Sequence, residues 1–190
     1  LKAKTKKEVY DVMSLSALMN FFAGCYDAMA KDIESAVAGI PEGENSNSLL
    51  SLRVLSLRVV SGSDMRNFNT YARGRYALYR GDETTAADSL MAAAADTSSV
   101  VASAAALSLG ERFREKGENG KALGWYRRAI EAARDTTVRV EAMMEAADVH
   151  SREMGDSEGA RKLYMDALTL YPGTVFEPEI RSRLRRIVEK

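Results

Sequence analysis

Apolar residues in this chain recur mostly every three or four positions, as on one face of an α-helix, whereas the strict alternation of a β-strand is scarce. Only three prolines interrupt long stretches rich in Ala, Leu, Arg, Glu and Met, which favour helix. We therefore predict essentially no sheet and ten helices, at 6–22, 25–38, 47–60, 65–80, 83–95, 98–116, 119–133, 136–154, 156–170 and 177–188.

Turn-forming residues separate the predicted helices. Residues 40–48, Ile-Pro-Glu-Gly-Glu-Asn-Ser-Asn-Ser, combine Pro, Gly and short polar side chains and form the clearest linker. Gly81, Gly117 and Gly155 each follow a helical run, where a residue with a left-handed backbone commonly ends the last turn.

The same three glycines begin an internal repeat. Gly81 and Gly117 are 36 residues apart, and Gly117 and Gly155 are 38 apart. At the same offsets, each glycine is followed by a similar trio: Ala86, Leu90 and Ala93; Ala122, Tyr126 and Ala129; Ala160, Tyr164 and Ala167. A period of this length predicts stacked helical hairpins, because a single hairpin cannot bury its apolar stripe.

Close packing of two helices explains the residue types in this repeat. A small residue at the start of each second helix lets the two backbones approach, and the large residue four positions later fills the gap between hairpins. We expect Ala86, Ala122 and Ala160 to be buried where the two helices of a hairpin cross.

These residues resemble the tetratricopeptide repeat. The best unit, residues 103–136, supplies Leu109, Gly110, Phe113, Gly117, Ala122, Tyr126 and Ala129 in the order and spacing of that family. It departs from the family at Ala106, where a Trp is usual, and at Arg134, where the closing Pro is usual. The unit that ends at Pro172 fits only with one residue inserted in its first helix, which places His150 at an aromatic position.

Weaker matches extend the resemblance toward the start of the chain. The unit around Gly74–Ala93 has Ala77 at the aromatic position, and a fourth match consists of Gly24, Met29, Ile33, Ala36 and Pro41. Residues 155–164 and 170–174 are similar to the bacterial cell-envelope subset of the family, the type of the Tol–Pal coordinating protein and the outer-membrane assembly lipoprotein.

The resemblance implies an all-α fold, a right-handed α-solenoid of antiparallel helix hairpins with a C-terminal capping helix. We expect a degenerate repeat-like helical part over 1–64. Over 65–190 we expect three hairpins and the capping helix in one continuous solenoid, at 65–96, 98–134, 136–172 and 177–188. In the capping helix, Ile180, Leu184, Ile187 and Val188 share one face, and we expect Arg181, Arg183, Arg185 and Arg186 to turn to solvent.

Composition narrows the class of protein. Lys plus Arg and Asp plus Glu both number 27, so the chain lacks the basic excess of a nucleic-acid binder. No apolar run is long enough for a membrane span or a signal peptide, so we expect no direct membrane contact from this chain. We expect a soluble domain, in the cytoplasm or cell envelope of a bacterium, and leave the compartment open because the single Cys25 forms no internal disulfide.

The start of the chain suggests a fragment of something longer. The sequence begins at Leu1, and Lys2, Lys4, Lys6 and Lys7 form a basic cluster. Such a cluster is typical of a solvated terminus, but it also marks the cytoplasmic flank of a transmembrane helix.

Candidate catalytic chemistry is scarce. His150 is the only histidine, and Cys25 stands in the apolar context typical of a small buried residue, so no pair has the spacing of zinc ligands. The carboxylates are scattered among basic residues, as Glu111 and Glu115 are around Arg114, which is typical of a solvated helix face. We predict no catalytic, cofactor or metal site, and no enzyme.

A binding surface is predicted from the resemblance, because first helices line the concave face of such arrays. The pattern maps nine residues there: Phe68, Tyr71, Arg75, Tyr79, Leu107, Glu111, Arg114, Met144 and Asp148. The mixture suits a peptide or helix with a few anchors and a polar rim. The family's basic clamp for a C-terminal carboxylate falls on Leu107 and Glu111 and is therefore absent.

The function favoured by these observations is a non-catalytic protein-interaction scaffold that binds a protein or peptide ligand on the concave face. Homo-oligomer formation stays open. A second hypothesis is a soluble tail of a larger bacterial membrane or envelope protein whose main activity lies outside this chain. A third is an enzyme on a helical scaffold, which the missing constellations disfavour.

Overall fold

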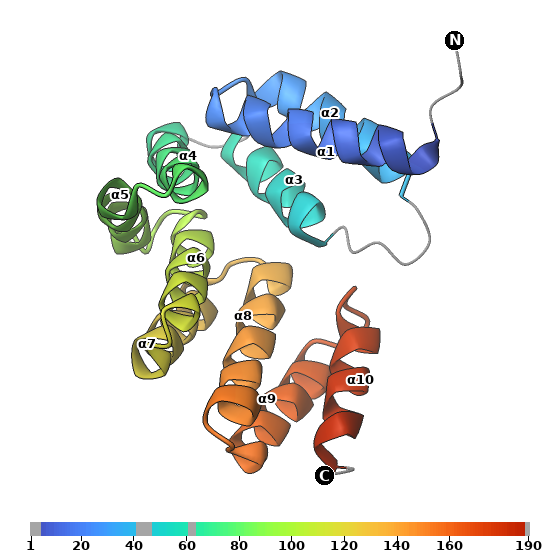
Figure 1. Ribbon diagram of the computed structural model, residues 1–190, viewed down its shortest axis with the longest axis vertical. Helices are drawn as coiled ribbons and strands as arrows, with labels where there is room; N and C mark the ends of the chain where they lie inside the picture. The colour runs from blue at the N-terminus through green and yellow to red at the C-terminus, as the bar shows by residue number, and fades with distance from the viewer. Residues whose placement is uncertain (1–4, 41–46, 61–63, 189–190) are drawn as a thin grey trace. The chain divides into compact units, whose positions relative to one another are not determined.

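The computed structural model describes residues 5–40, 47–60 and 64–188, and all regular structure within these ranges is helical (Figure 1). The elements are α1 (Lys6–Phe22), α2 (Tyr26–Ala38), α3 (Asn47–Val60), α4 (Met65–Arg80), α5 (Glu83–Ala95), α6 (Ala102–Glu115), α7 (Asn119–Ala132), α8 (Thr136–Asp148), the π-helix η1 (Val149–Glu153), α9 (Ser157–Leu170) and α10 (Glu177–Val188). The all-α class and the ten predicted helices are confirmed, whereas Lys2, Lys4 and most of the predicted linker, including Pro41, lie outside the described residues.

Local chemistry sets most helix ends where the sequence places them. Thr5 and Glu8 form a capping box at the start of α1, in which each side chain bonds the other residue's backbone N–H. Gly81, Gly117 and Gly155 all have a positive φ, between 69° and 75°, and this left-handed backbone ends α4, α6 and η1 as predicted.

One helix begins later than predicted. We expected a helix from residue 98, but α6 begins at Ala102. Asp96 accepts hydrogen bonds from the backbone N–H and the hydroxyl of Ser98, and the Ser99 hydroxyl accepts one from Val101 N at 3.1 Å. These short side chains hold the backbone in a turn and so delay the first helical turn.

The chain divides into two compact units, Leu1–Ala86 and Ala87–Lys190, here called the first and second unit. Residue 64, where the sequence analysis divides the chain, lies inside the first unit. In the first unit α1 packs along α2 and also contacts α4 (Figure 1). The Phe21 ring fixes that contact, because its centroid lies 5.4 Å from Phe68 and 5.8 Å from Tyr71.

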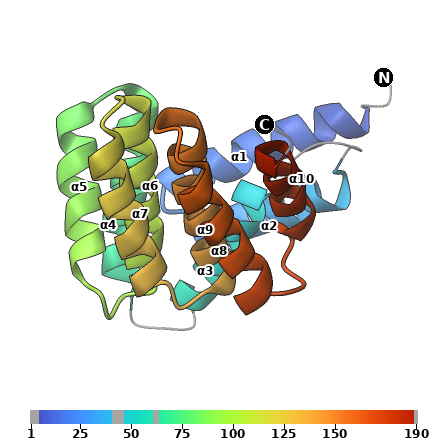
Figure 2. The same ribbon diagram turned by 90° about the horizontal axis from the view of Figure 1, so that it is seen from below.

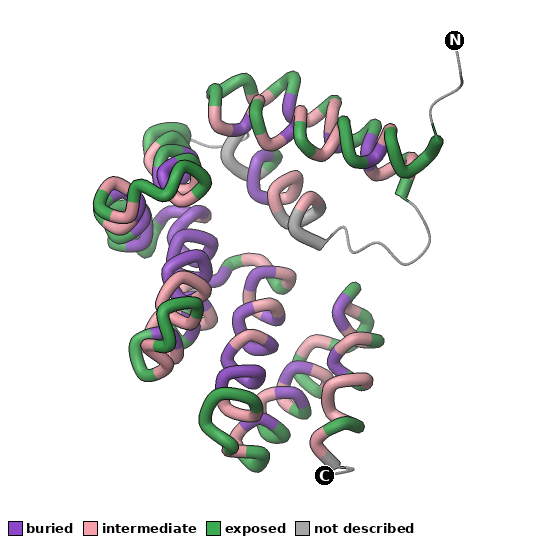
Figure 3. Tube along the Cα trace, in the orientation of Figure 1, coloured by how far each residue is buried: buried purple, intermediate pink, exposed green. Residues whose placement is uncertain are grey.

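The second unit contains two successive helical hairpins, α6–α7 and α8–α9, followed by α10 against α9 (Figure 2). Buried positions run along most of α6 and α8 (Figure 3). A core of Val140, Met144, Tyr164, Phe176 and Ile180 joins α8, α9 and α10, and Leu184 and Ile187 pack against it. These contacts confirm the predicted apolar face of α10 over its described side chains.

The predicted small residues are buried. Ala86, Ala122 and Ala160 expose 1% of their surface or less. Gly110 and Tyr126 make a close contact in the α6–α7 hairpin, since a Cβ atom added to Gly110 would lie 2.4 Å from Tyr126 Cε1. Gly110 is therefore required because the buried tyrosine ring lies directly on the backbone of α6.

The one-residue insertion that the repeat spacing requires has a structural counterpart. At the end of α8 the backbone changes from α-helix to the π-helix η1, over Val149–Glu153, which includes His150. A π-turn accommodates one extra residue without ending a helix. The π-helix therefore lies where the repeat spacing predicts the extra residue.

Among the described residues, no helix is long and apolar enough to cross a membrane.

Candidate functional site

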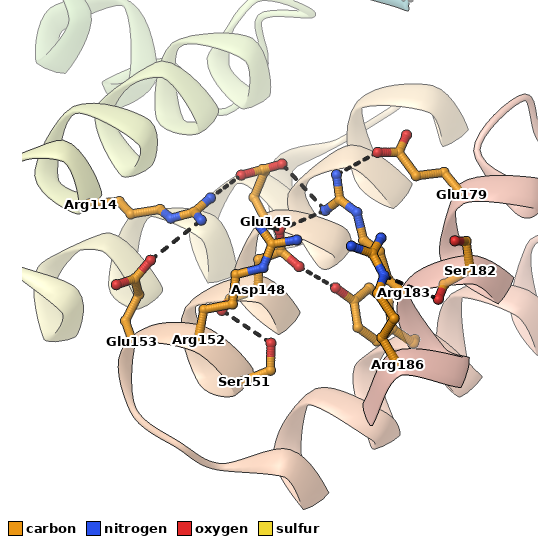
Figure 4. Close-up of polar contacts among 11 residues, drawn as sticks. Arg114, Glu145, Asp148, Ser151, Arg152, Glu153, Glu179, Ser182, Arg183 and Arg186 are labelled. Atoms are coloured by element: carbon orange, nitrogen blue, oxygen red, sulfur yellow. Dashed lines mark hydrogen bonds and ion pairs between the residues drawn. The ribbon is translucent and has the colours of Figure 1, made fainter. Parts of the chain in front are cut away.

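The most concentrated polar chemistry of the second unit lies where α6, α8 and α10 come together (Figure 4). Its centre is Asp148, which is 2% exposed. Arg183 Nη1 lies 2.8 Å from Asp148 Oδ2, and Arg152 Nη1 lies 3.3 Å from the same oxygen. The Tyr164 hydroxyl donates to Asp148 Oδ1, so both carboxylate oxygens are engaged. A buried carboxylate needs such partners, because desolvation otherwise outweighs its stabilising contacts.

Glu145 connects this centre to α6. Its Oε2 accepts a hydrogen bond of 2.6 Å from Arg114 Nη1, and its Oε1 lies 3.9 Å from Arg183 Nη1. Arg114 also reaches Glu153 at 3.5 Å (Figure 4). Burial raises the pKa of the Glu145 carboxyl, and the two arginines oppose that rise.

Beside this network is a cavity of about 350 Å³, which lies entirely within the second unit. Six side chains line it: Glu111, Arg114, Glu115, Tyr126, Glu145 and Glu153. Four are carboxylates and one is a guanidinium, so the lining is predominantly acidic. Its size suits a side chain or a small ligand, at the lower end of the range for binding pockets.

Tyr126 is the unusual member of this lining. Its hydroxyl is buried and makes no hydrogen bond to any described residue. Burial, together with the charges of Glu145 and Glu111, raises the pKa of the phenol, while nearby Arg114 acts in the opposite direction. The hydroxyl therefore stays neutral at ordinary pH and keeps both its donor and its acceptor capacity.

The structure divides the predicted groove residues of the second unit into two groups. Glu111 and Arg114 line the cavity together, as predicted for a shared surface. Leu107, Met144 and Asp148 are instead buried, and we correct their assignment from groove surface to interior. On α8 the residue that meets Arg114 is Glu145, one position after the predicted Met144.

The predicted residues of the first unit are placed differently. Phe68 and Tyr71 are interior residues that pack against Phe21, which again corrects a surface assignment. Arg75 Nη1 donates to the Tyr71 hydroxyl at 2.9 Å. Tyr79 remains 63% exposed. The nine predicted groove residues belong to both units, so the groove that they would form together stays a prediction.

Two features of charge and surface were missed by the sequence analysis. Arg183 was expected in solvent, but only 15% of its side chain is exposed, and Arg114 is likewise half-buried rather than part of a solvated face. The repeat spacing could have indicated that Arg183 faces the same way as Glu145, because the two residues are 38 positions apart, as Gly117 and Gly155 are. In the first unit α1 exposes Val12, Leu15 and Met19, whose helical spacing marks a second apolar face.

The residues that could carry metal or thiol chemistry are accounted for in the described part of the chain. No group of three or more His, Cys, Asp or Glu residues there could hold a metal ion. His150 Nδ1 lies 2.8 Å from Asp156 Oδ2, and Asp156 Oδ1 caps α9 by accepting from Gly159 N at 2.9 Å. Cys25 is exposed, contrary to the buried position that its apolar context suggested.

Comparison with known proteins adds no relative: no family model matches the sequence, and no curated protein or solved structure matches it significantly. The resemblance to tetratricopeptide repeats therefore stays a prediction from the residues.

Proposed function

We propose that this chain is a non-catalytic protein-interaction module, which binds a peptide or a helix of a partner protein on the face that α6 and α8 share. The observation that carries the proposal is the cavity between these helices, with Glu111 and Arg114 contributed by one hairpin and Glu145 by the next. Such a surface arises only when hairpins stack, and stacked hairpins are well suited to binding extended ligands.

The composition of this face supports binding rather than catalysis. The charged groups around Arg114 and Glu145 pair with one another and fix the wall of the cavity. Tyr and Arg side chains at such a wall are the types that anchor protein interfaces, where a few residues supply most of the affinity. The second unit is thus suited to present a rigid, charged surface to a partner.

We also propose the finer fold that the repeat suggests, a right-handed α-solenoid of the tetratricopeptide type, of the subset found in bacterial envelope proteins. Its support is the contact of Tyr126 with Gly110 and the left-handed Gly117 and Gly155 at equivalent turns. An experimental structure tests it directly, because a left-handed path of successive hairpins contradicts it.

Selection from a displayed library of random short peptides tests the binding function. The purified chain is immobilised, and enriched peptides are measured by fluorescence anisotropy against wild type and two variants. Glu111→Arg places a bulky cation in the cavity, whereas Arg161→Ala removes an exposed guanidinium on α9 that pairs with Glu158 in the same helix. We expect Glu111→Arg to abolish binding and Arg161→Ala to leave it unchanged, with both variants melting as cooperatively as wild type.

Two results count against the proposal. One is the absence of any enriched peptide. The other is a set of peptides that binds wild type and Glu111→Arg equally, which would place the binding surface elsewhere on the chain.

A further inference from the structure

Helix α4 in the first unit carries arginines without the acidic residues that accompany them on several other helices. Its range, Met65–Arg80, includes Arg66, Arg73, Arg75 and Arg80 but no Asp or Glu. On α6, α9 and α10, by contrast, surface arginines pair with a glutamate three or four positions away in the same helix. Such local pairing is common on helix surfaces, so the composition of α4 needs another explanation.

Three of these arginines lie on one exposed stripe of α4. The stripe consists of Arg66, Asn69, Arg73, Tyr76 and Arg80, all of them exposed. Their positions recur at alternating steps of three and four, which is the spacing of a single helix face. Successive arginines are seven residues apart, which corresponds to roughly 10.5 Å along the helix axis. We call this face the arginine stripe.

The guanidiniums of the arginine stripe lack acidic partners. Within the described ranges, Arg66, Arg73 and Arg80 form no ion pair. Asp82 follows the helix, but its Oδ1 accepts a hydrogen bond of 3.1 Å from Thr85 N at the start of α5. Hydrogen bonds with Thr85 are the main cause of the lowered pKa of Asp82, and the charges of Arg80 and Arg73 act in the same direction. The stripe thus retains an excess of positive charge.

The placement of the stripe favours binding rather than helix stability. Arg66 stands in the first turn of α4, where the helix dipole makes a cation unfavourable. The Arg80 guanidinium lies 5.8 Å from the ring centroid of Tyr76, which in turn lies 5.2 Å from the Phe22 ring of α1. These contacts hold Tyr76 in place although 41% of it is exposed. Tyr and Arg are the side chains that most often anchor protein interfaces.

We infer that the arginine stripe is the docking face for an acidic α-helix of a partner protein, whose carboxylates recur every seven residues and pair with Arg66, Arg73 and Arg80. A helix laid along α4 has the same rise per residue, so acidic residues seven positions apart meet each arginine in turn. The occupant follows from charge complementarity, because an acidic helix supplies the anions that α4 lacks. This surface belongs to the first unit and goes beyond the α6–α8 face proposed above.

Nucleic acids and anionic membranes fit the stripe less well. Phosphates follow one another at about 3.4 Å along each strand of a duplex, so cations roughly 10.5 Å apart leave most of them unmatched. The whole chain has 27 basic and 27 acidic residues and so lacks the long-range attraction of a polyanion binder. A helix that lies on a membrane needs a broad apolar face, whereas Asn69 and Tyr76 separate the arginines here.

Helical peptides test the inference on the full chain. Three alanine-rich peptides of equal length are titrated by fluorescence anisotropy. The register peptide has glutamates at three positions seven apart, with leucine beside the central one; the second has the same residues spread over different faces, and the third has glutamine for glutamate. We expect the register peptide to bind, the second to bind roughly tenfold more weakly and the third not to bind. No binding of the register peptide, or equal binding of the first two, would overturn the inference.

Charge-matched variants locate the contact. The test variant replaces all three arginines of the stripe by glutamine. The control removes the same charge at three exposed positions of the second unit, as Arg161→Gln, Arg181→Gln and Arg185→Gln. We expect the test variant to bind the register peptide roughly tenfold more weakly than wild type and the control to keep its affinity. Both should unfold in urea as cooperatively as wild type, because the replaced side chains are exposed. Equal losses in the two variants would place the contact elsewhere.

Other occupants of the stripe are distinguished by the same proteins. A single-stranded oligothymidylate and vesicles that contain phosphatidylserine are titrated alongside the register peptide, and sedimentation equilibrium measures self-association. We expect weaker binding of both polyanions than of the peptide, and the same molecular mass for wild type and the test variant. Tighter binding of either polyanion that is lost in the test variant would overturn the inference in favour of that ligand. A wild-type dimer that becomes monomeric in the test variant would assign the stripe to a second copy of this chain.

Discussion

The hairpins α6–α7 and α8–α9 share a packing plan but differ in how their polar groups are completed. Each places a fully buried tyrosine, Tyr126 or Tyr164, nine positions after a left-handed glycine. In the second hairpin the Tyr164 hydroxyl donates to Asp148, which also pairs with Arg183. In the first hairpin the Tyr126 hydroxyl lies beside an acidic cavity and has no hydrogen-bond partner among the described residues. The shared repeat thus specifies the packing, whereas side chains from neighbouring helices determine whether the tyrosine hydroxyl is hydrogen-bonded. We call the Tyr164 position, with its bonded hydroxyl, the closed site and the Tyr126 position the open site.

The closed hairpin should be the more sensitive of the two to loss of charge. Asp148→Ala removes the acceptor of Tyr164 and the partner of Arg183 and leaves both buried without it. Breaking such a buried pair typically costs about 3–5 kcal/mol. We expect a loss of this size in urea unfolding. The control, Glu158→Ala, breaks an exposed pair with Arg161 and should change stability by about 0–1 kcal/mol. Equal effects of the two variants would contradict the buried pairing of Asp148.

The packing plan itself is tested at Gly110. Gly110→Ala puts a methyl group 2.4 Å from a ring carbon of the buried Tyr126, so the ring or the helix must move. We expect a loss of about 1–3 kcal/mol, the usual cost of overpacking. The matched variant is Gly124→Ala in α7, where a Cβ would meet nothing within 4 Å. It should stabilise the protein by roughly 0.5–1 kcal/mol, because Ala favours helix over Gly.

Thermal or urea unfolding of both glycine variants provides the measurement. We expect the free energy of unfolding to fall in Gly110→Ala and to rise in Gly124→Ala. A Gly110→Ala variant as stable as wild type would mean that Tyr126 does not pack on this glycine.

Removal of each tyrosine hydroxyl compares the hairpins directly. Tyr164→Phe leaves one oxygen of Asp148 without its donor, and we expect a loss of about 1–3 kcal/mol. Tyr126→Phe removes a hydroxyl that has no hydrogen-bond partner within the described ranges, so the stability of this variant should change by less than about 0.5 kcal/mol or rise slightly. Urea unfolding at neutral pH measures both, and a larger loss in Tyr126→Phe would contradict the open site.

The smallest expected effect is at the turns of the two hairpins. Asp156 caps α9, whereas the residue before α7, Glu118, makes no side-chain cap. The hydrogen bond from Gly159 N, followed by that with His150, lowers the pKa of Asp156. A carboxyl with a lowered folded pKa adds stability above its unfolded pKa and loses it as the pH falls through the folded value.

We therefore expect Asp156→Ala to destabilise the chain at neutral pH and the gap from wild type to shrink toward acid, below the usual pKa range of aspartate. Glu118→Ala, the control at the uncapped turn, should show no comparable pH dependence. Urea unfolding of the three proteins across this pH range measures the difference in stability between Asp156→Ala and wild type. A difference that grows in acid would contradict the role of Asp156 as a helix cap.

The sequence by itself determined the helices, their turns and the packing positions. Helical periodicity, the left-handed glycines and the small residue at Ala122 and Ala160 are properties of short stretches, so they can be read without knowing which helices meet. Even the extra residue near His150 was visible as a shift in spacing, and it appears as the π-helix η1.

Only the tertiary structure decided which charges face one another. A rotation of α8 by one residue separates the predicted Met144 from the observed Glu145, and no local pattern fixes that rotation. The pairing of Arg183 with Asp148 joins residues from different helices, so it depends on how α10 packs, and it turned an expected solvent residue into a buried partner. Local spacing sets which residues share a helix face, whereas the orientation of stacked helices sets what that face meets.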